Sequence, residues 1–201
     1  MPLSHRSVDT GSLSTTSSQD PISHTMSTFP ETLNTPRLSL HRATSTHEGP
    51  LFDMHSDEQV MAWLGGIKSR EENRKWLEIK IQHWEDHGFG LFAFYDHENR
   101  FVGRGGLLSV DIDDEARVEL NYSIAADHWG MGYATEAGAC LISAGFETLS
   151  LHEVVAFTLP SNKASQRVMK KVGMTYERDF THHQETAVLY RIRNDHRLTN
   201  A

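Results

Sequence analysis

The 201-residue sequence contains one cysteine, Cys140, so it cannot form an intramolecular disulfide or a zinc site built from cysteines. It has no run of about 18 apolar residues, as a transmembrane helix would require. It is also short of positive charge, with 19 Lys and Arg against 27 Asp and Glu and a net charge of −8. A general nucleic-acid-binding protein needs a basic face. The composition therefore predicts a protein of the cytoplasm, a reducing compartment, with neither a membrane nor a nucleic acid as its partner.

The first 34 residues differ from the rest because they are rich in Ser and Thr and poor in apolar side chains. Such a segment buries too little apolar area to offset a backbone entropy cost of roughly 1–2 kcal/mol per residue. It also lacks the apolar core of a secretory signal, and Arg6 is its only arginine, which disfavours a transit peptide. We expect residues 1–34 to be a disordered tail, residues 35–193 to form one domain, and residues 194–201 to be a C-terminal tail.

From residue 35 onward the pattern is that of a folded domain. Residues 37–42 alternate apolar and polar side chains, which indicates a half-buried strand. Ser69 and Glu72 form a capping box that predicts the start of a helix, and Gly88 ends it. Similar signals predict a short helix after a capping box at residues 56–59, a hairpin of strands at residues 91–95 and 101–108, and a strand at residues 116–124.

The second half of the domain alternates helices and strands. A helix at residues 136–149 is rich in small side chains, and its apolar stripe includes Cys140. A helix at residues 163–172 is expected to bury Ala164, Val168 and Val172, and Gly173 follows its end. Strands are predicted at residues 153–158, 174–180 and 186–192. This order of elements predicts an α/β fold with a mixed sheet.

A glycine-rich turn, Gly130-Met131-Gly132, joins the strand at residues 116–124 to the following helix. Glycines let backbone N–H groups approach an anion closely, and the N-terminus of a helix adds partial positive charge. The turn is not a P-loop, because no Gly-Lys-Ser/Thr follows it. It is not a dinucleotide-binding fingerprint either, because Thr135 stands where the third glycine belongs.

Three segments together identify a family resemblance. The runs ELNYSI (residues 119–124), HWGMGYATEA (128–137) and NKASQRVMKKVGM (162–174) resemble the GNAT superfamily of N-acetyltransferases, in particular the branch that acetylates ribosomal-protein N-termini and related amines. The resemblance covers roughly residues 35–193. One departure is Trp129, which stands where many members have Gln or Arg. The resemblance implies a mostly antiparallel mixed sheet whose central parallel strands splay apart, flanked by helices.

The resemblance also implies acetyl-CoA as the acetyl donor. A pyrophosphate needs clustered N–H donors, and an extended amide-bearing arm fits beside an open strand edge. The backbone amides expected to hold the pyrophosphate are those of Gly130, Met131, Gly132, Tyr133, Ala134 and Thr135, and Trp129 before them is also expected to contact the cofactor. The pantetheine arm is expected beside Ser123, Ile124 and Ala125, with Asn162 hydrogen-bonded to it and Ser165 close by.

The implied reaction is direct attack of a free amine on the thioester, without a metal, with a strand N–H near Ile124 stabilising the oxyanion. Many members use a Tyr as general acid toward the leaving thiolate, but Met169 occupies that position here. Ser165, one turn earlier, matches a Ser of the N-terminal-acetylating branch and could donate to the sulfur directly or through water. Glu119 is the candidate general base, acting through water. Both could instead be structural: Ser165 bonded back to its helix, and Glu119 salt-bridged.

The expected acceptor is a primary amine, either a protein N-terminus or a small amine. The α-amine is favoured because the sequence shows no second clear acidic pocket for a polyamine. Whether the chain forms a homodimer is left open. The alternative function is a non-catalytic module that binds acyl-CoA as a sensor or scaffold, because Gly132, Ala134 and Asn162 would serve both functions.

Other residue patterns have simpler interpretations. His83 and His87 lie four residues apart, as zinc ligands can, but Trp84 stands where a zincin has its Glu, so an exposed polar face is favoured. Cys140 is expected to be a small buried residue and not a nucleophile. The basic residues of the helix at 163–172 form either a solvated face or a contact to the CoA 3′-phosphate: Lys163, Arg167, Lys170 and Lys171.

Overall fold

A computed structural model describes residues 28–182 and 184–194. The strands in these ranges are β1 (Thr32–Asn34), β2 (Leu38–Arg42), β3 (Leu91–Asp96), β4 (Phe101–Ile112), β5 (Glu115–Ile124), β6 (Glu153–Thr158), β7 (Thr175–His182) and β8 (Glu185–Arg193). The α-helices are α1 (Glu48–His55), α2 (Glu58–Met61), α3 (Arg70–His87), α4 (Tyr133–Thr148) and α5 (Lys163–Lys171), with 3₁₀ turns η1 (Ser45–His47) and η2 (Ala126–His128).

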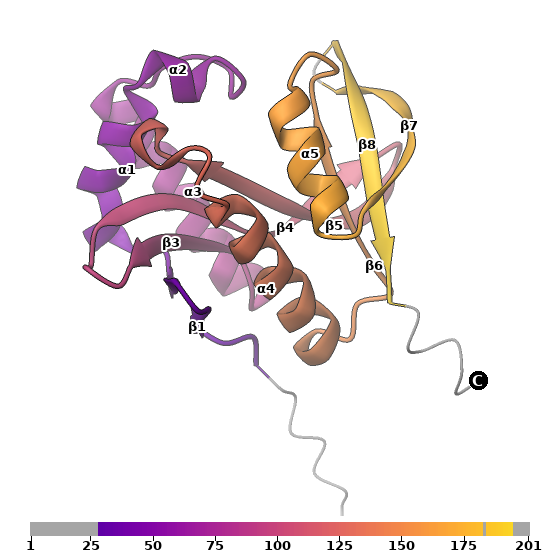
Figure 1. Ribbon diagram of the computed structural model, residues 1–201, viewed down its shortest axis with the longest axis horizontal. Coiled ribbons are helices and arrows are strands. Elements are labelled where there is room, and N and C mark those ends of the chain that lie inside the picture. Colours follow the sequence, from indigo (N-terminus) through magenta and orange to yellow (C-terminus); the bar gives the residue numbers. More distant parts are fainter. Residues whose placement is uncertain (1–27, 183, 195–201) are drawn as a thin grey trace, which may run out of the picture.

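One sheet organises the domain (Figure 1). Its strand order is β1-β2-β3-β4-β5-β6-β8-β7, and every neighbouring pair is antiparallel except β5 and β6. Helix α3 lies behind the sheet in Figure 1, whereas α4 lies in front of it. The predicted α/β fold, with a mixed and mostly antiparallel sheet flanked by helices, is confirmed. No helix in the described ranges is long and apolar enough to cross a membrane.

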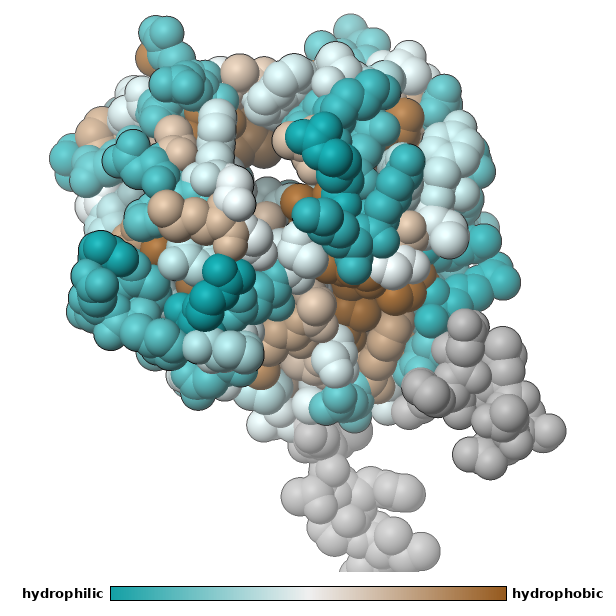
Figure 2. All heavy atoms as spheres, in the orientation of Figure 1, coloured by the Kyte–Doolittle hydropathy of each residue, from teal (hydrophilic) through white to brown (hydrophobic). Residues whose placement is uncertain are grey.

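The central parallel strands are joined at one point. Glu119 and Val155 are the pair that links β5 to β6, although β5 continues to Ile124. The two strands diverge beyond this pair, and the backbone of the last part of β5 faces an open gap on that side. Figure 2 shows the surface hollowed between the α1–α2 region and α5, above this divergence.

The N-terminal boundary of the domain lies earlier than predicted. Strand β1 falls within the expected tail, yet it pairs with β2 through Leu33 and Leu40. Phe29 is only 3% exposed, and its ring centroid lies 6.0 Å from those of both Trp84 and Phe92. A few apolar residues are enough to order a segment when they pack on an existing core. The composition of the segment alone does not reveal such packing. The expectation for residues 1–27 lies outside the described residues.

The C-terminal boundary shifts by one residue. The backbone N–H of Asn194 donates to the carbonyl of His152 at 2.9 Å, so Asn194 belongs to the domain although the sequence assigned it to a tail. The expectation for residues 195–201 lies outside the described part of the chain.

The early helices agree only in part with the sequence patterns. Helix α1 lies where no helix is predicted, and it carries Pro50 in its first turn. Proline is tolerated in the first turn of a helix, where no intrahelical N–H bond is lost. The cap of α2 is Asp57, which accepts from the N–H of Gln59 at 2.8 Å, whereas the predicted Ser56 ends α1. The capping box of α3 and its left-handed Gly88 cap are confirmed.

Helix α5 is rotated relative to the prediction. Gln166, Met169 and Val172 are buried, whereas Ala164 is exposed and Val168 is half-buried. The predicted inward face was therefore wrong at Ala164. The rotation places Met169 at 1% exposure and directs Ser165 toward β5, where it meets Tyr122.

Candidate active site

The loop between β5 and α4 presents a row of backbone donors. Trp129 donates to the carbonyl of Ala126 at 3.1 Å, and Thr135 donates to the carbonyl of Gly132 at 3.1 Å. Between these two residues, the N–H groups of 130–134 have no backbone acceptor within the described residues. Gly130 and Gly132 adopt positive φ values of 78° and 84°. Such a row at a helix N-terminus suits an anion. We call residues 129–135 the phosphate loop.

Two of the residues predicted to contact the cofactor, Trp129 and Thr135, already use their backbone N–H groups. The indole Nε1 of Trp129 donates to the carbonyl of Ile124 at 2.7 Å, so this side chain fastens the loop to the end of β5. Within the predicted cradle, the N–H groups without a backbone acceptor in the described residues are those of Gly130, Met131, Gly132, Tyr133 and Ala134.

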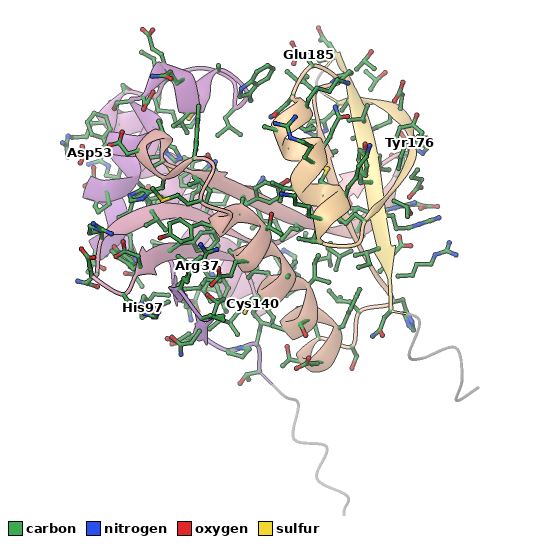
Figure 3. The ribbon with its side chains drawn as sticks, in the orientation of Figure 1. Arg37, Asp53, His97, Cys140, Tyr176 and Glu185 are labelled. Atoms are coloured by element: carbon green, nitrogen blue, oxygen red, sulfur yellow. The ribbon has the colours of Figure 1, made fainter. Side chains whose placement is uncertain are left out.

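A clamp that the sequence analysis missed holds the phosphate loop against β2. Arg37 donates from Nη1 to the carbonyl of Met131 at 2.8 Å and from Nε to Glu136 Oε2 at 2.7 Å. Thr35 donates to Glu136 Oε1 at 2.6 Å. Burial alone would raise the pKa of Glu136, but the hydrogen bonds from Thr35 and Arg37 outweigh burial and lower it. In Figure 3, Arg37 lies beside the start of α4.

The end of β5 turns alternate residues toward the gap. The N–H of Ala125 donates to the carbonyl of Val102 in β4 at 3.0 Å. Because antiparallel bonding alternates along a strand, the backbone of Ser123 also faces β4, and the backbone of Ile124 faces the gap. Of the three residues expected beside the pantetheine arm, Ile124 is thus the one that presents an N–H to it.

On the far side of the gap, α5 brings two predicted residues together. Asn162 is the N-cap of α5, and its Oδ1 accepts from the N–H of Ser165 at 3.1 Å. The Oγ of Ser165 lies 2.9 Å from the hydroxyl of Tyr122, which also donates to the Ser165 carbonyl at 3.0 Å. Burial raises the pKa of Tyr122 to about 12, so it stays protonated. Ser165 is therefore bonded across the gap to β5, and not to its own helix alone.

Glu119 lies on the opposite face of β5, beneath α3. Its residue is 9% exposed, and its Oε1 accepts from the amide Nδ2 of Asn121 at 3.3 Å. Burial raises the pKa of Glu119, against the opposing effects of Asn121, Lys80 and Arg104. A carboxylate with a raised pKa is a stronger base than an exposed one, as a proton acceptor requires. Within the described residues, no Lys, Arg or His side chain forms a salt bridge with Glu119.

A buried polar chain continues from Glu119, and the sequence analysis did not predict it. Arg104 of β4 donates to Asn121 Oδ1 through Nη1 and to His55 Nε2 through Nε at 3.2 Å. An arginine remains protonated, so it fixes Asn121 with its oxygen toward Arg104 and its amide N–H toward Glu119. We call Glu119, Asn121, Arg104, His55 and Asn73 the polar chain.

His55 ends this chain as a neutral ring. Its Nε2 accepts from Arg104, so its proton lies on Nδ1, 2.7 Å from Asn73 Oδ1. Burial and the charge of Arg104 lower the pKa of His55 to about 4. The ring of Trp76 on α3 lies against the Arg104 guanidinium at 4.8 Å from its centroid. The sequence did contain a signal for this chain, because Arg104 lies within an apolar, glycine-rich strand. A charge buried in such a strand requires polar partners.

A hollow that the sequence analysis did not anticipate lies on the α1 side of β5. It is a cavity of about 430 Å³ between α1, α2 and the end of β5. Its lining includes Asp53, Asp57 and Asp127, together with Ala125 and His128. The expectation that there is no second acidic pocket is therefore wrong.

The structure confirms only some of the simpler interpretations given for His83, Cys140 and the basic residues of α5. His83 is not a free ligand, because the N–H of Ser109 donates to its Nε2 at 2.9 Å and its Nδ1 lies 2.9 Å from the Phe89 carbonyl. Cys140 is half-buried and not fully buried, and burial with nearby carboxylates raises the pKa of its thiol, which disfavours a nucleophile. The four basic residues of α5, Lys163, Arg167, Lys170 and Lys171, are all exposed.

Comparison with known proteins assigns this architecture. The family model for an acetyltransferase (GNAT) domain matches residues 37–175. The chain belongs to the GNAT acetyltransferase family. The uncharacterized protein YkkB of Bacillus subtilis is 30% identical over 148 residues, covering 73% of this chain and 86% of the relative. FsC-acetyl coenzyme A-N(2)-transacetylase of Aspergillus fumigatus is 28% identical over 167 residues, covering 77% and 69%. This GNAT domain is thus an acetyl-CoA-dependent acyltransferase.

Solved structures share the fold of the GNAT domain. An acetyltransferase from Agrobacterium tumefaciens superposes with a TM-score of 0.71 at 24% identity, covering 81% of this chain and 94% of that one. An enzyme from Salmonella typhimurium that modifies the N-terminal serine of ribosomal protein L7/L12 gives 0.70 at 16% identity, covering 83% and 99%. Spermidine N-acetyltransferase from Vibrio cholerae, with CoA and spermine, gives 0.65 at 16% identity, covering 78% and 95%.

Proposed function

We propose that this protein transfers an acetyl group from acetyl-CoA to a primary amine by direct attack within a ternary complex. The observation that carries the proposal is the arrangement around the gap between β5 and β6. Unpaired N–H groups of the phosphate loop lie at one end, Ser165 lies on the α5 side, and Glu119 lies on the opposite face of β5. Donor and acceptor would therefore meet at the gap from two sides.

The residues present fit an acetyl-CoA molecule. The row of N–H groups at Gly130 to Ala134 would bind the pyrophosphate. Asn162 uses its Oδ1 to cap α5, which leaves its Nδ2 to donate to a carbonyl of the pantetheine arm. The Ile124 N–H faces the gap and would polarise the thioester carbonyl. Acetyl-CoA supplies an activated acyl group, and the chain supplies its orientation.

Protons move on both sides of the new bond. The attacking amine nitrogen bonds to the thioester carbon, and the carbon–sulfur bond breaks. Glu119 takes the ammonium proton through water, because its raised pKa and buried position make it the base of this face. Ser165 donates a hydrogen bond to the leaving sulfur when the Tyr122 hydroxyl turns from the Ser165 carbonyl to the Ser165 Oγ. The thiolate takes up its proton from water, either directly or through this hydroxyl pair. Met169 is fully buried and takes no part.

The names of similar proteins and the demand on the base support the proposed acceptor class. By their names, the proteins compared above act at an N(2) position, on a protein N-terminal serine and on spermidine. An α-amine has a pKa of ~7.7–8 and offers a fair share of free base at neutral pH. We propose an α-amine first and a small polyamine second, with the reaction taking place in the cytoplasm.

The decisive experiment measures release of the CoA thiol when acetyl-CoA is mixed with amines. The panel contains peptides with free Ser, Ala and Thr N-termini, the same peptides with acetylated N-termini as controls, spermidine, and small amino compounds. Thiol release that matches the N-acetylated product supports the transferase. If acetyl-CoA raises the Tm but no amine releases thiol, the protein is instead a binding module. Turnover of spermidine without any peptide would reverse the order of acceptors.

A further inference from the structure

Two cations share the acceptor face with Glu119. Arg104 on β4 lies against the ring of Trp76 on α3, and Lys80 follows Trp76 by one turn on the same face of that helix; both cations interact electrostatically with Glu119. Their charges sum to two against the single carboxylate, because His55 is neutral. Lys80, Arg104 and Glu119 together therefore carry one positive charge more than they neutralise among themselves.

Neither cation has a carboxylate of its own. Among residues 28–182 and 184–194, no Asp or Glu oxygen lies within 4.0 Å of Lys80 Nζ or of the Arg104 guanidinium. The contrast is Arg117, another poorly exposed arginine, which is paired with Glu115, Glu153 and Glu177. Arg104 is only 5% exposed. Burial of a cation without an anion costs free energy.

Both cations keep a donor for a ligand. Arg104 uses Nε and Nη1 for His55 and Asn121, which leaves the Nη2 edge of its fork. No fully enclosed polar side-chain atom of the described residues lacks a partner, so the unpartnered Nη2 is not completely enclosed. Lys80 is half-buried with no hydrogen-bond partner of its own in the described ranges, and its ammonium group has three N–H donors.

We propose that the acceptor is a primary amine that also carries a carboxylate, and that Lys80 and Arg104 bind this carboxylate beside Glu119. The inference rests on the proposed transferase function and specifies its substrate class. An acidic group on the acceptor would neutralise the excess charge and fill the unused donors. It would also hold the amine at a fixed distance from the base. A polyamine would instead bring further positive charge to Lys80 and Arg104, and its place would be the hollow lined by Asp53, Asp57 and Asp127.

The test compares matched acceptors that differ in one charge. The pairs are L-alanine with L-alaninamide, β-alanine with β-alaninamide, and Asp-Ala-amide with Asn-Ala-amide, each assayed for CoA thiol release. For at least one pair, we expect kcat/KM of the acid to exceed that of the amide by ~10–100-fold, as one charge-assisted hydrogen-bonding site supplies. Lys80→Met should bring this ratio to about 1. Lys75→Met, on the exposed side of the same helix, should leave it unchanged.

Several results would overturn the subsite. Equal rates for acid and amide in the wild-type protein would do so, and so would a preference that persists in Lys80→Met. If Lys80→Met shifts the pH profile but keeps the ratio, Lys80 tunes Glu119 and binds no substrate. If no amine is acetylated, the proposed transferase function is wrong, and a binding experiment then tests the subsite on its own. In CoA-saturated protein, glutarate but not glutaramide should raise the Tm, and Lys80→Met should lose this rise; no rise with glutarate would contradict the subsite.

Discussion

The two sides of the gap are built in different ways. The phosphate loop offers backbone N–H groups that one short segment supplies, with two glycines at positive φ. The proposed acceptor side instead offers buried side chains from α1, α3, β4 and β5. The first kind of site depends on local chain conformation, and the second depends on how distant elements pack. The comparison explains why relatives can share a donor while their names point to different acceptors.

Loss of the N-terminal segment should destabilise the whole domain, and therefore both sides of the gap. Deleting residues 1–34 removes Phe29 and β1, and the loss of one fully buried Phe alone costs about 3–5 kcal/mol. We expect this deletion to lower the free energy of unfolding by at least that amount in a urea titration. Deleting residues 1–27 is the matched control and should leave it nearly unchanged. Equal stability of the two truncated proteins would show that the segment 28–34 is dispensable.

A variant of the loop should affect the cofactor side alone. Gly132→Val places a branched side chain at a φ of 84°, where its Cβ would lie 3.4 Å from Arg37 Nη2. We expect acetyl-CoA to bind at least about 100-fold more weakly, so that the Tm rise at moderate ligand concentration disappears. Gly65→Val is the control, because it has a similar φ of 85° and open space around it. A folded Gly132→Val protein with an unchanged Tm rise would contradict the loop assignment.

A pH series should affect the acceptor side alone. The pKa of His55 is lowered from 6.5 to about 4 in the folded protein. Between these two pH values, His55 is protonated in the unfolded chain and neutral in the folded protein. Stability from this residue is therefore present at neutral pH and is lost as the pH falls toward 4. We expect about 2 kcal/mol of loss between pH ~7.5 and ~5. His55→Gln should flatten this slope, whereas replacement of the exposed His87 should not.

A smaller effect is expected where the two sides meet. Ser165→Ala removes the hydroxyl that is paired with Tyr122, and kcat should fall about 10-fold with little dependence on pH. The neighbouring Ser161→Ala, in the turn before α5, serves as the control. Wild-type kcat in Ser165→Ala would show that water alone protonates the sulfur and that Ser165 only links α5 to β5.

The same comparison explains what the sequence could predict. The phosphate loop, Asn162 and Ser165 lie in contiguous motifs, and the structure brings them to one gap. Glu119 was found because it alternates with apolar residues on β5. Arg104 and His55 were missed, because 49 positions of sequence separate two atoms that lie 3.2 Å apart. Phe29 was missed because one aromatic residue in a polar segment has no periodicity.

The most direct test of the account is the pH dependence of Glu119→Gln, measured as kcat/KM for an amine that the wild-type protein acetylates. This variant keeps the hydrogen-bonding shape of the side chain and removes its basicity. We expect a loss on the order of 10²-fold near neutral pH. The loss should shrink as the pH rises, because free amine and hydroxide replace the missing base. A loss that is constant with pH, or no loss at all, would contradict the assignment of Glu119 as the proton acceptor at the gap.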